Sequence, residues 1–131
     1  MTTRRATCSC EALSVVTEGE PTRISMCHCL ACQRRTGGTF AVQARFPVER
    51  VTIEGASTEY ARVGDSGGTA RFHFCPICGA TVYYRIDGMP DVVAVPVGAF
   101  ADPSFPPPKV SVYEARRHAW TGIPVDAEHW D

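Results

Sequence analysis

The stretch TARFHFCPICGATVYYRI, residues 69–86, places two cysteines in a tight turn between two β-prone runs. Apolar and polar residues alternate over residues 69–74, and a second strand-like run over residues 80–86 leaves the turn. A Cys-Pro-x-Cys-Gly segment is typical of a zinc knuckle, in which two thiolates approach one ion and the glycine takes a backbone conformation that other residues resist. The stretch therefore predicts two strands joined by a turn in which Cys75 and Cys78 supply half of a metal site.

Five further cysteines precede the knuckle. Cys8 and Cys10 form one group, and Cys27, Cys29 and Cys32 form the other. The first residues, MTTRRATCSCEA, lack the apolar segment of a secretory signal, so we expect a reducing compartment in which clustered cysteines bind metal. The odd count of seven also disfavours a complete set of disulfides.

The seven cysteines can be grouped in two ways. In the first, the N-terminal pair joins the knuckle in a four-thiolate site, and the central three cysteines form a separate site. In the second, Cys29 and Cys32 join the knuckle as a zinc ribbon, which leaves three cysteines without a site. Spacing alone does not decide, but one short loop can hold the three central cysteines with little loss of loop entropy, which favours the first grouping. Four thiolates close a structural zinc site, whereas three leave a position for water or substrate.

Other side chains could complete or serve the three-thiolate site. A histidine ligand would make it a second structural site; His73 is the better candidate, because His28 lies between two ligands and is expected to point away. An open site would instead need hydrogen-bond donors for an oxygen that gains negative charge, or for a substrate carboxylate. The candidate donors are Thr36, the amides near Gly37 and Gly38, Arg34 and Arg35.

The rest of the chain predicts a mostly-β fold. About eight or nine short β-prone runs are separated by Gly, Pro and Asp, and no helical pattern of 10–15 residues lies between them. Residues 30–36 suit one or two helical turns that end at Gly37. No linker or internal repeat divides the chain, so we expect a single small domain over residues 1–131.

Composition narrows the expected partners. The net charge of −1 disfavours binding to nucleic acid through bulk electrostatics. No run of eighteen apolar residues is present, so we expect no membrane span and take the cytoplasm as the location. The oligomeric state does not follow from the sequence.

The cysteine pattern resembles the glutathione-dependent formaldehyde-activating enzyme family, also called the centromere-protein-V type. The likeness continues beyond the cysteines and covers nearly the whole chain. It rests on five segments, which are Cys8-x-Cys10, Cys27-His28-Cys29-x-x-Cys32-Gln33-Arg34-x-Thr36-Gly37, Phe74-Cys75-x-x-Cys78-Gly79, Val95-x-Val97-Gly98-Ala99-Phe100-Ala101-Asp102-Pro103 and Arg116-Arg117-x-Ala119-Trp120. One departure is Glu11, where members of the family usually have glycine after the first cysteine pair.

The resemblance implies a fold of tent-like antiparallel sheets and two zinc ions per chain. Cys8, Cys10, Cys75 and Cys78 would hold a structural zinc. The three central cysteines, Cys27, Cys29 and Cys32, would hold a second, exchangeable zinc that need not be fully occupied.

The resemblance also implies a carbon–sulfur lyase activity. Glutathione or another small thiol would condense with formaldehyde or a related aldehyde, as in S-(hydroxymethyl)glutathione synthesis. The three cysteines of the open zinc would form the catalytic centre. The alternative is a non-catalytic zinc module that binds a thiol compound, a protein or nucleic acid.

Overall fold

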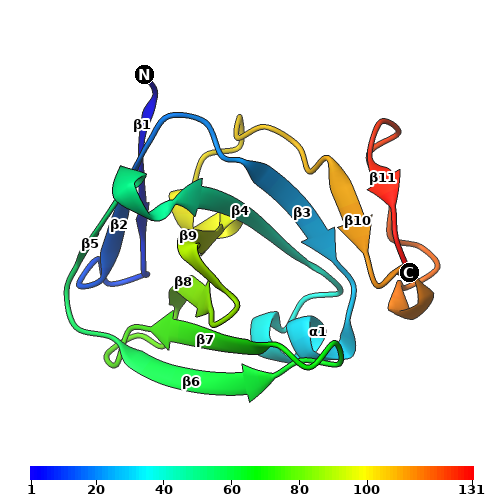
Figure 1. Cartoon of the computed structure of the whole chain (residues 1–131), viewed down its shortest axis with the longest axis horizontal. Coiled ribbons are helices and arrows are strands. Elements are labelled where there is room, and N and C mark those ends of the chain that lie inside the picture. Colours follow the sequence, from blue (N-terminus) through cyan, green and yellow to red (C-terminus); the bar gives the residue numbers. More distant parts are fainter.

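A computed structural model describes residues Met1–Asp131 and shows a mostly-β protein with one α-helix (Figure 1). The helix α1 covers Leu30–Thr36, the residues predicted from the sequence. Three short 3₁₀ turns lie at Val48–Arg50, Val97–Phe100 and Glu114–Arg116. The eleven strands are β1 Thr3–Thr7, β2 Ser14–Glu18, β3 Arg23–Cys27, β4 Ala41–Pro47, β5 Val51–Glu54, β6 Thr58–Val63, β7 Thr69–Phe74, β8 Thr81–Ile86, β9 Met89–Pro96, β10 Val110–Val112 and β11 Glu128–His129.

The strands form two sheets. The smaller sheet has the order β1-β2-β5 and the larger has the order β11-β10-β3-β4-β9-β8-β7-β6. Figure 1 shows the smaller sheet at the left and β10 and β11 at the right. The expected antiparallel pairing holds except at one edge, where β10 runs parallel to β3 and β11 runs parallel to β10. Long stretches of chain separate these partners, so no tight hairpin imposes an antiparallel pairing on them.

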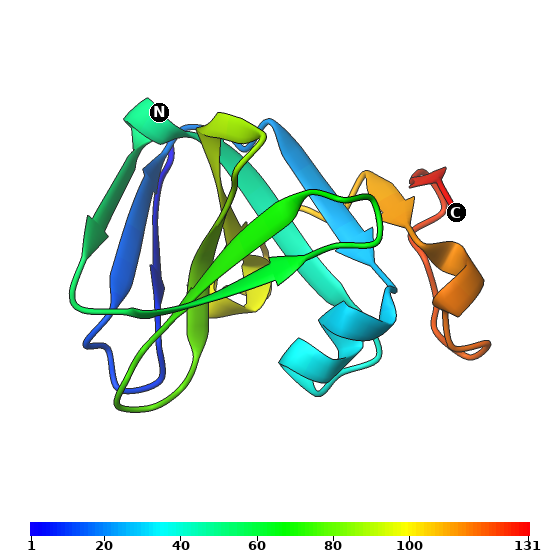
Figure 2. The same ribbon diagram turned by 60° about the horizontal axis from the view of Figure 1, so that its bottom comes forward.

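The main core lies between the two sheets. One cluster of thirteen buried residues joins them, with Leu13 and Val15 from the smaller sheet's hairpin and Phe46, Val82 and Val95 from the larger sheet. Burying a large apolar side chain of this kind stabilises a fold by about 1.5–3 kcal/mol. The opposite face of the larger sheet is therefore free of the smaller sheet, and α1 lies at the end of β3 and beside this second face (Figure 2).

Local signals explain why α1 matches its predicted bounds. The Cys29 side chain caps the first turn by accepting a hydrogen bond from the Cys32 N–H at 3.3 Å. Gly37 ends the helix in the left-handed conformation, with φ of 73°. The helix start therefore places two of the three central cysteines.

Two strands lie outside the predicted runs. The strand β1 has only one apolar residue, Ala6, and is held by antiparallel pairing with β2, so its own sequence carries little strand signal. The strand β11 has two residues, which is too short for any periodicity. None of the helices has the length and apolar character needed to cross a membrane.

Candidate metal centres and the adjoining cavity

The knuckle and the N-terminal cysteine pair meet in space. The sulfur atoms of this first cluster, Cys8, Cys10, Cys75 and Cys78, all lie within 4.8 Å of one another. Cys10 Sγ lies 3.7 Å from Cys8 Sγ and 3.6 Å from Cys75 Sγ. Zinc–sulfur bonds of about 2.3 Å in a tetrahedron require sulfur–sulfur separations of about 3.8 Å. The first cluster therefore has the donor set and the spacing of a closed four-thiolate zinc site.

Two similar turns build the first cluster. The Cys75 N–H donates to the Ala80 carbonyl at 3.0 Å, and the Cys8 N–H donates to the Leu13 carbonyl at 3.0 Å. Each turn also contains a left-handed residue, Gly79 with φ of 82° and Glu11 with φ of 66°. The turn thus keeps the conformation that suits glycine, although a glutamate occupies the position.

Backbone hydrogen bonds prepare thiolates in the first cluster. The N–H groups of Ala80 and then Cys10 lower the pKa of Cys78 to about 6. The pKa of Cys10 is raised to about 11, because hydrogen bonding with Cys75, together with burial, outweighs the lowering effect of the Ala12 backbone. The thiolate is the form of cysteine that binds metal, so these turns favour one ready ligand even before an ion arrives.

The second cluster consists of Cys27, Cys29 and Cys32, whose sulfur atoms also lie within 4.8 Å of one another. Cys27 ends β3, and Cys29 and Cys32 belong to the start of α1. Hydrogen bonds from Cys27 and then Cys32 lower the pKa of Cys29, and Arg62 adds to this effect. No histidine, aspartate or glutamate joins these three thiols. The structure thus has the first of the two groupings considered from the sequence.

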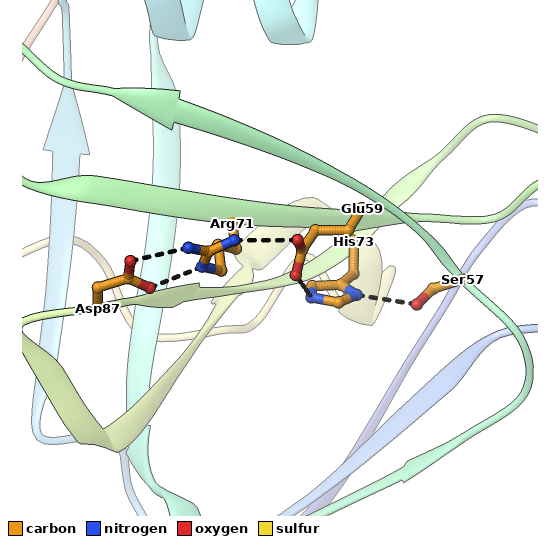
Figure 3. A network of polar contacts seen from close by, with 5 residues as sticks. All are labelled: Ser57, Glu59, Arg71, His73 and Asp87. Atoms are coloured by element: carbon orange, nitrogen blue, oxygen red, sulfur yellow. Dashed lines mark hydrogen bonds and ion pairs between the residues drawn. The ribbon is translucent and has the colours of Figure 1, made fainter.

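The two candidate histidines lie away from the second cluster. His28 is fully buried, and its Nε2 atom lies 2.9 Å from Ser111 Oγ in β10, so the ring points away from the thiols as expected. His73 belongs to a polar network on the other face of the larger sheet, where it contacts Ser57 and Glu59 (Figure 3). Neither ring completes a four-ligand site.

A cavity of about 230 Å³ adjoins the second cluster. The three cysteines form one part of its wall, and the loop between β6 and β7 forms another. Arg35 of α1 and Arg62 of β6 contribute the only basic side chains, and Asp65 of the loop contributes the only acidic one. Strands of the larger sheet also contribute Gln43, Thr69, Phe72 and Tyr84 to this wall.

Tyr84 and Gln43 bring unused hydrogen-bonding groups to the cavity. Tyr84 is 8% exposed, and burial raises the pKa of its hydroxyl, which therefore stays protonated. Gln43 donates to Ser25 Oγ at 2.8 Å, but its Oε1 atom has no partner. Tyr84 thus offers a protonated hydroxyl to the wall that also holds the three thiols, and Gln43 Oε1 is an acceptor that no protein donor satisfies.

The predicted oxygen-stabilising donors divide between two places. Arg35 lines the cavity, whereas Gly37, Gly38 and Arg34 line a separate hollow on the far side of α1. The Thr36 hydroxyl donates to the Cys32 carbonyl at 2.9 Å and so belongs to the helix end. Sequence reasoning missed the cavity residues that come from distant strands of the larger sheet, among them Gln43, Arg62, Phe72 and Tyr84. The alternation within each strand was the available signal, but it does not reveal which strands are neighbours.

Two comparisons show what the chain is similar to. A model of the glutathione-dependent formaldehyde-activating enzyme family matches residues 3–116, a range that holds all seven cysteines. The chain belongs to this family. A crystal structure of a Rhodobacter sphaeroides protein is similar in fold, with 20% sequence identity and a TM-score of 0.59 over 97% of this chain and 99% of that chain. At this identity, the structural likeness supports the fold alone.

Both cysteine clusters of this formaldehyde-activating family member could hold metal ions. The first offers four thiols at zinc-like spacing, and the second offers three thiols beside a cavity. Thiolate sets of this kind select soft or borderline ions such as Zn²⁺.

Proposed function

We propose that this protein is a zinc-dependent enzyme of the carbon–sulfur lyase type, which joins a small thiol to formaldehyde or a related aldehyde. Glutathione is the first candidate thiol, because the family's description names it. One observation supports the proposal above all others: three cysteine thiols with no fourth protein ligand lie in the wall of a cavity.

The two clusters would have different roles. Cys8, Cys10, Cys75 and Cys78 would hold a structural zinc, and Cys27, Cys29 and Cys32 would hold the zinc of the reaction centre. A zinc ion bound there would lower the pKa of a substrate thiol and favour its thiolate. We place the protein in the cytoplasm, where thiols stay reduced, and treat residues 1–131 as one domain.

The chain's own residues would position the reactants. As the substrate sulfur bonds to the aldehyde carbon, the carbonyl oxygen gains negative charge and requires a proton. The protonated hydroxyl of Tyr84 is suited to donate a hydrogen bond to that oxygen. Gln43, which lines the same cavity, has a buried Oε1 atom without a hydrogen-bond partner. The aromatic wall around Phe72 reduces the water that competes for these contacts.

The experiment measures adduct formation directly. The zinc-loaded protein is mixed with ¹³C-formaldehyde and glutathione. NMR exchange spectroscopy then measures the rate at which formaldehyde and its S-hydroxymethyl adduct with glutathione interconvert. We expect the protein to accelerate exchange above the spontaneous rate, and the Cys29→Ser protein to lose the acceleration. A rate equal to the spontaneous one for a panel of thiols and aldehydes, despite saturable thiol binding, would replace the enzyme proposal with the non-catalytic binding module.

A further inference from the structure

Four arginines lie at one face of the larger sheet. Arg23, Arg45 and Arg62 belong to its strands, and Arg35 belongs to α1 beside it. Cross-strand neighbours form a row across the sheet, in which Phe72 pairs with Tyr84, Tyr84 with Ala94, Ala94 with Arg45, and Arg45 with Arg23. Because side chains of paired residues lie on the same face, this row places Arg23 and Arg45 on the face that carries Phe72. The guanidinium groups of Arg35 and Arg62 lie 4.6 and 5.2 Å from the centre of the Phe72 ring.

None of these four arginines has an acidic partner. The arginine ion pairs of the protein involve only Arg4, Arg5 and Arg71. The Nε atom is buried without a hydrogen-bond partner in each of the four, Arg23, Arg35, Arg45 and Arg62. Arg23 and Arg45 also lie directly opposite each other, a placement that is unfavourable for like charges. This face therefore carries an excess of positive charge that the protein does not neutralise with carboxylates.

Arg71, in the hairpin formed by β6 and β7, is an arginine that does have acidic partners. It lies on the opposite face of β7, where two of its nitrogens contact Asp87 at 2.7 and 3.0 Å and a third contacts Glu59 at 3.2 Å (Figure 3). Asp87 and Glu59 thus take up the donors of one exposed arginine. The half-buried Arg62, on the cavity side, has no such carboxylate although burial makes an unpaired charge more costly.

The second cysteine cluster accounts for only part of this charge. A divalent ion with three thiolates carries one negative charge, whereas Arg35 and Arg62 together carry two positive charges. The one carboxylate in the cavity wall, Asp65, belongs to an exposed loop residue and forms no ion pair with either arginine. A ligand with a carboxylate group beside the thiols would neutralise the remaining positive charge. Guanidinium groups bind carboxylates with paired hydrogen bonds.

We propose that Arg35 and Arg62 bind a carboxylate of the substrate, so that this site selects small thiols with a carboxylate a few bonds from the sulfur. The inference rests on the proposed function, because it places the thiol at the second cluster. Arg35 follows Cys32 by three residues on α1, which puts both side chains on one face of the helix. The cavity of about 230 Å³ beside the thiols has room for a small molecule. Arg35 and Arg62 are specificity-determining residues in this account.

The test compares two thiols that differ in charge but hardly in shape, 3-mercaptopropionate and 3-mercaptopropionamide. Their binding to the zinc-loaded protein is measured by titration calorimetry and checked by the sulfur-to-metal band of the cobalt-substituted protein. A charge-assisted hydrogen bond contributes enough for the carboxylate to bind about ten-fold or more tightly than the amide. We expect Arg35→Gln and Arg62→Gln each to remove most of this preference, so that the affinity for the acid falls much more than the affinity for the amide.

The control is Arg85→Gln, which makes the same charge change on the opposite face, since Arg85 pairs with Arg71 in the sheet. It should keep the full preference. Arg35→Lys keeps the positive charge but removes the paired hydrogen bonds, so it should keep part of the preference. This variant replaces Arg35→Gln in the test if Arg35→Gln folds poorly. Equal affinity of the wild-type protein for acid and amide would overturn this inference and leave the proposed function standing. If neither thiol binds, the proposed function fails and this inference fails with it.

Discussion

The two cysteine clusters differ in how far apart their ligands lie along the chain. In the first cluster, Cys10 and Cys75 are separated by 65 positions, and the turn between β1 and β2 meets the turn between β7 and β8. In the second, all three cysteines lie within residues 27–32 and contact a cavity. A metal ion that joins distant segments contributes its binding energy to folding, whereas one held by a single short loop adds little to the fold. The comparison therefore predicts a structural role for the first cluster and a chemical role for the second.

The largest effect is expected for Cys78→Ser, which removes one ligand of the first cluster. Structural zinc sites contribute roughly 10 kcal/mol of binding energy, which is comparable to the whole stability of a small domain. The variant should be unfolded or insoluble, as judged by circular dichroism and size-exclusion chromatography. A folded, soluble Cys78→Ser protein would show that the first cluster does not hold the two sheets together.

Cys29→Ser should separate metal binding from folding. Loss of one of three local ligands is expected to release about one zinc ion per chain while the fold remains. Metal analysis by mass spectrometry and thermal unfolding of the same sample provide the two measurements. If Cys29→Ser unfolds as fully as Cys78→Ser, the difference between the clusters disappears.

Tyr84→Phe sharpens the role of the second cluster without touching a cysteine. Removing the hydroxyl leaves the buried ring in place, so the fold should be kept. Loss of one hydrogen-bond donor to a developing negative oxygen lowers a rate by roughly 100-fold. We expect a decrease of this order in the formaldehyde exchange rate, with zinc content and thiol affinity unchanged. An unchanged exchange rate would remove Tyr84 from the mechanism.

The smallest effect is expected at the turn of the first cluster. Glu11 has φ of 66°, a conformation that costs a residue with a side chain about 1–2 kcal/mol. Glycine avoids this strain, but it makes the unfolded chain more flexible, which lowers the stability of the fold by about 0.4–1 kcal/mol. Glu11→Gly should therefore stabilise the fold by at most about 1.6 kcal/mol in chemical denaturation. Gly79→Ala, in the matching turn, should have the opposite sign because its φ is 82°. Equal effects of the two substitutions would contradict the similarity of the turns.

Much of the fold could be predicted because its signals are local. The bounds of α1 follow from a capping side chain and Gly37, and the limits of β7 follow from alternation that ends at the knuckle. The cysteine motifs likewise bring the ligands of each turn together within a few residues. These features need no knowledge of which strands are neighbours.

The cavity could not be predicted in this way, because its wall depends on pairing between distant strands. Tyr84 and Arg45 lie in the same row only through β9, and irregular register between β8 and β9 shifts that row. The sequence therefore suggested Arg35, a neighbour of the cysteines, but not Arg62. The family resemblance suggested the proposed activity, and the geometry identified the residues around the second cluster.

The most direct test of the two roles is stepwise removal of zinc from the wild-type protein. A chelator is added in increments, and native mass spectrometry counts the bound zinc while circular dichroism follows the fold. We predict that one zinc ion leaves first with the fold and the second ion intact, and that the fold is lost only when the second ion leaves. Release of both ions in a single step together with unfolding would contradict the assignment of different roles to the two clusters.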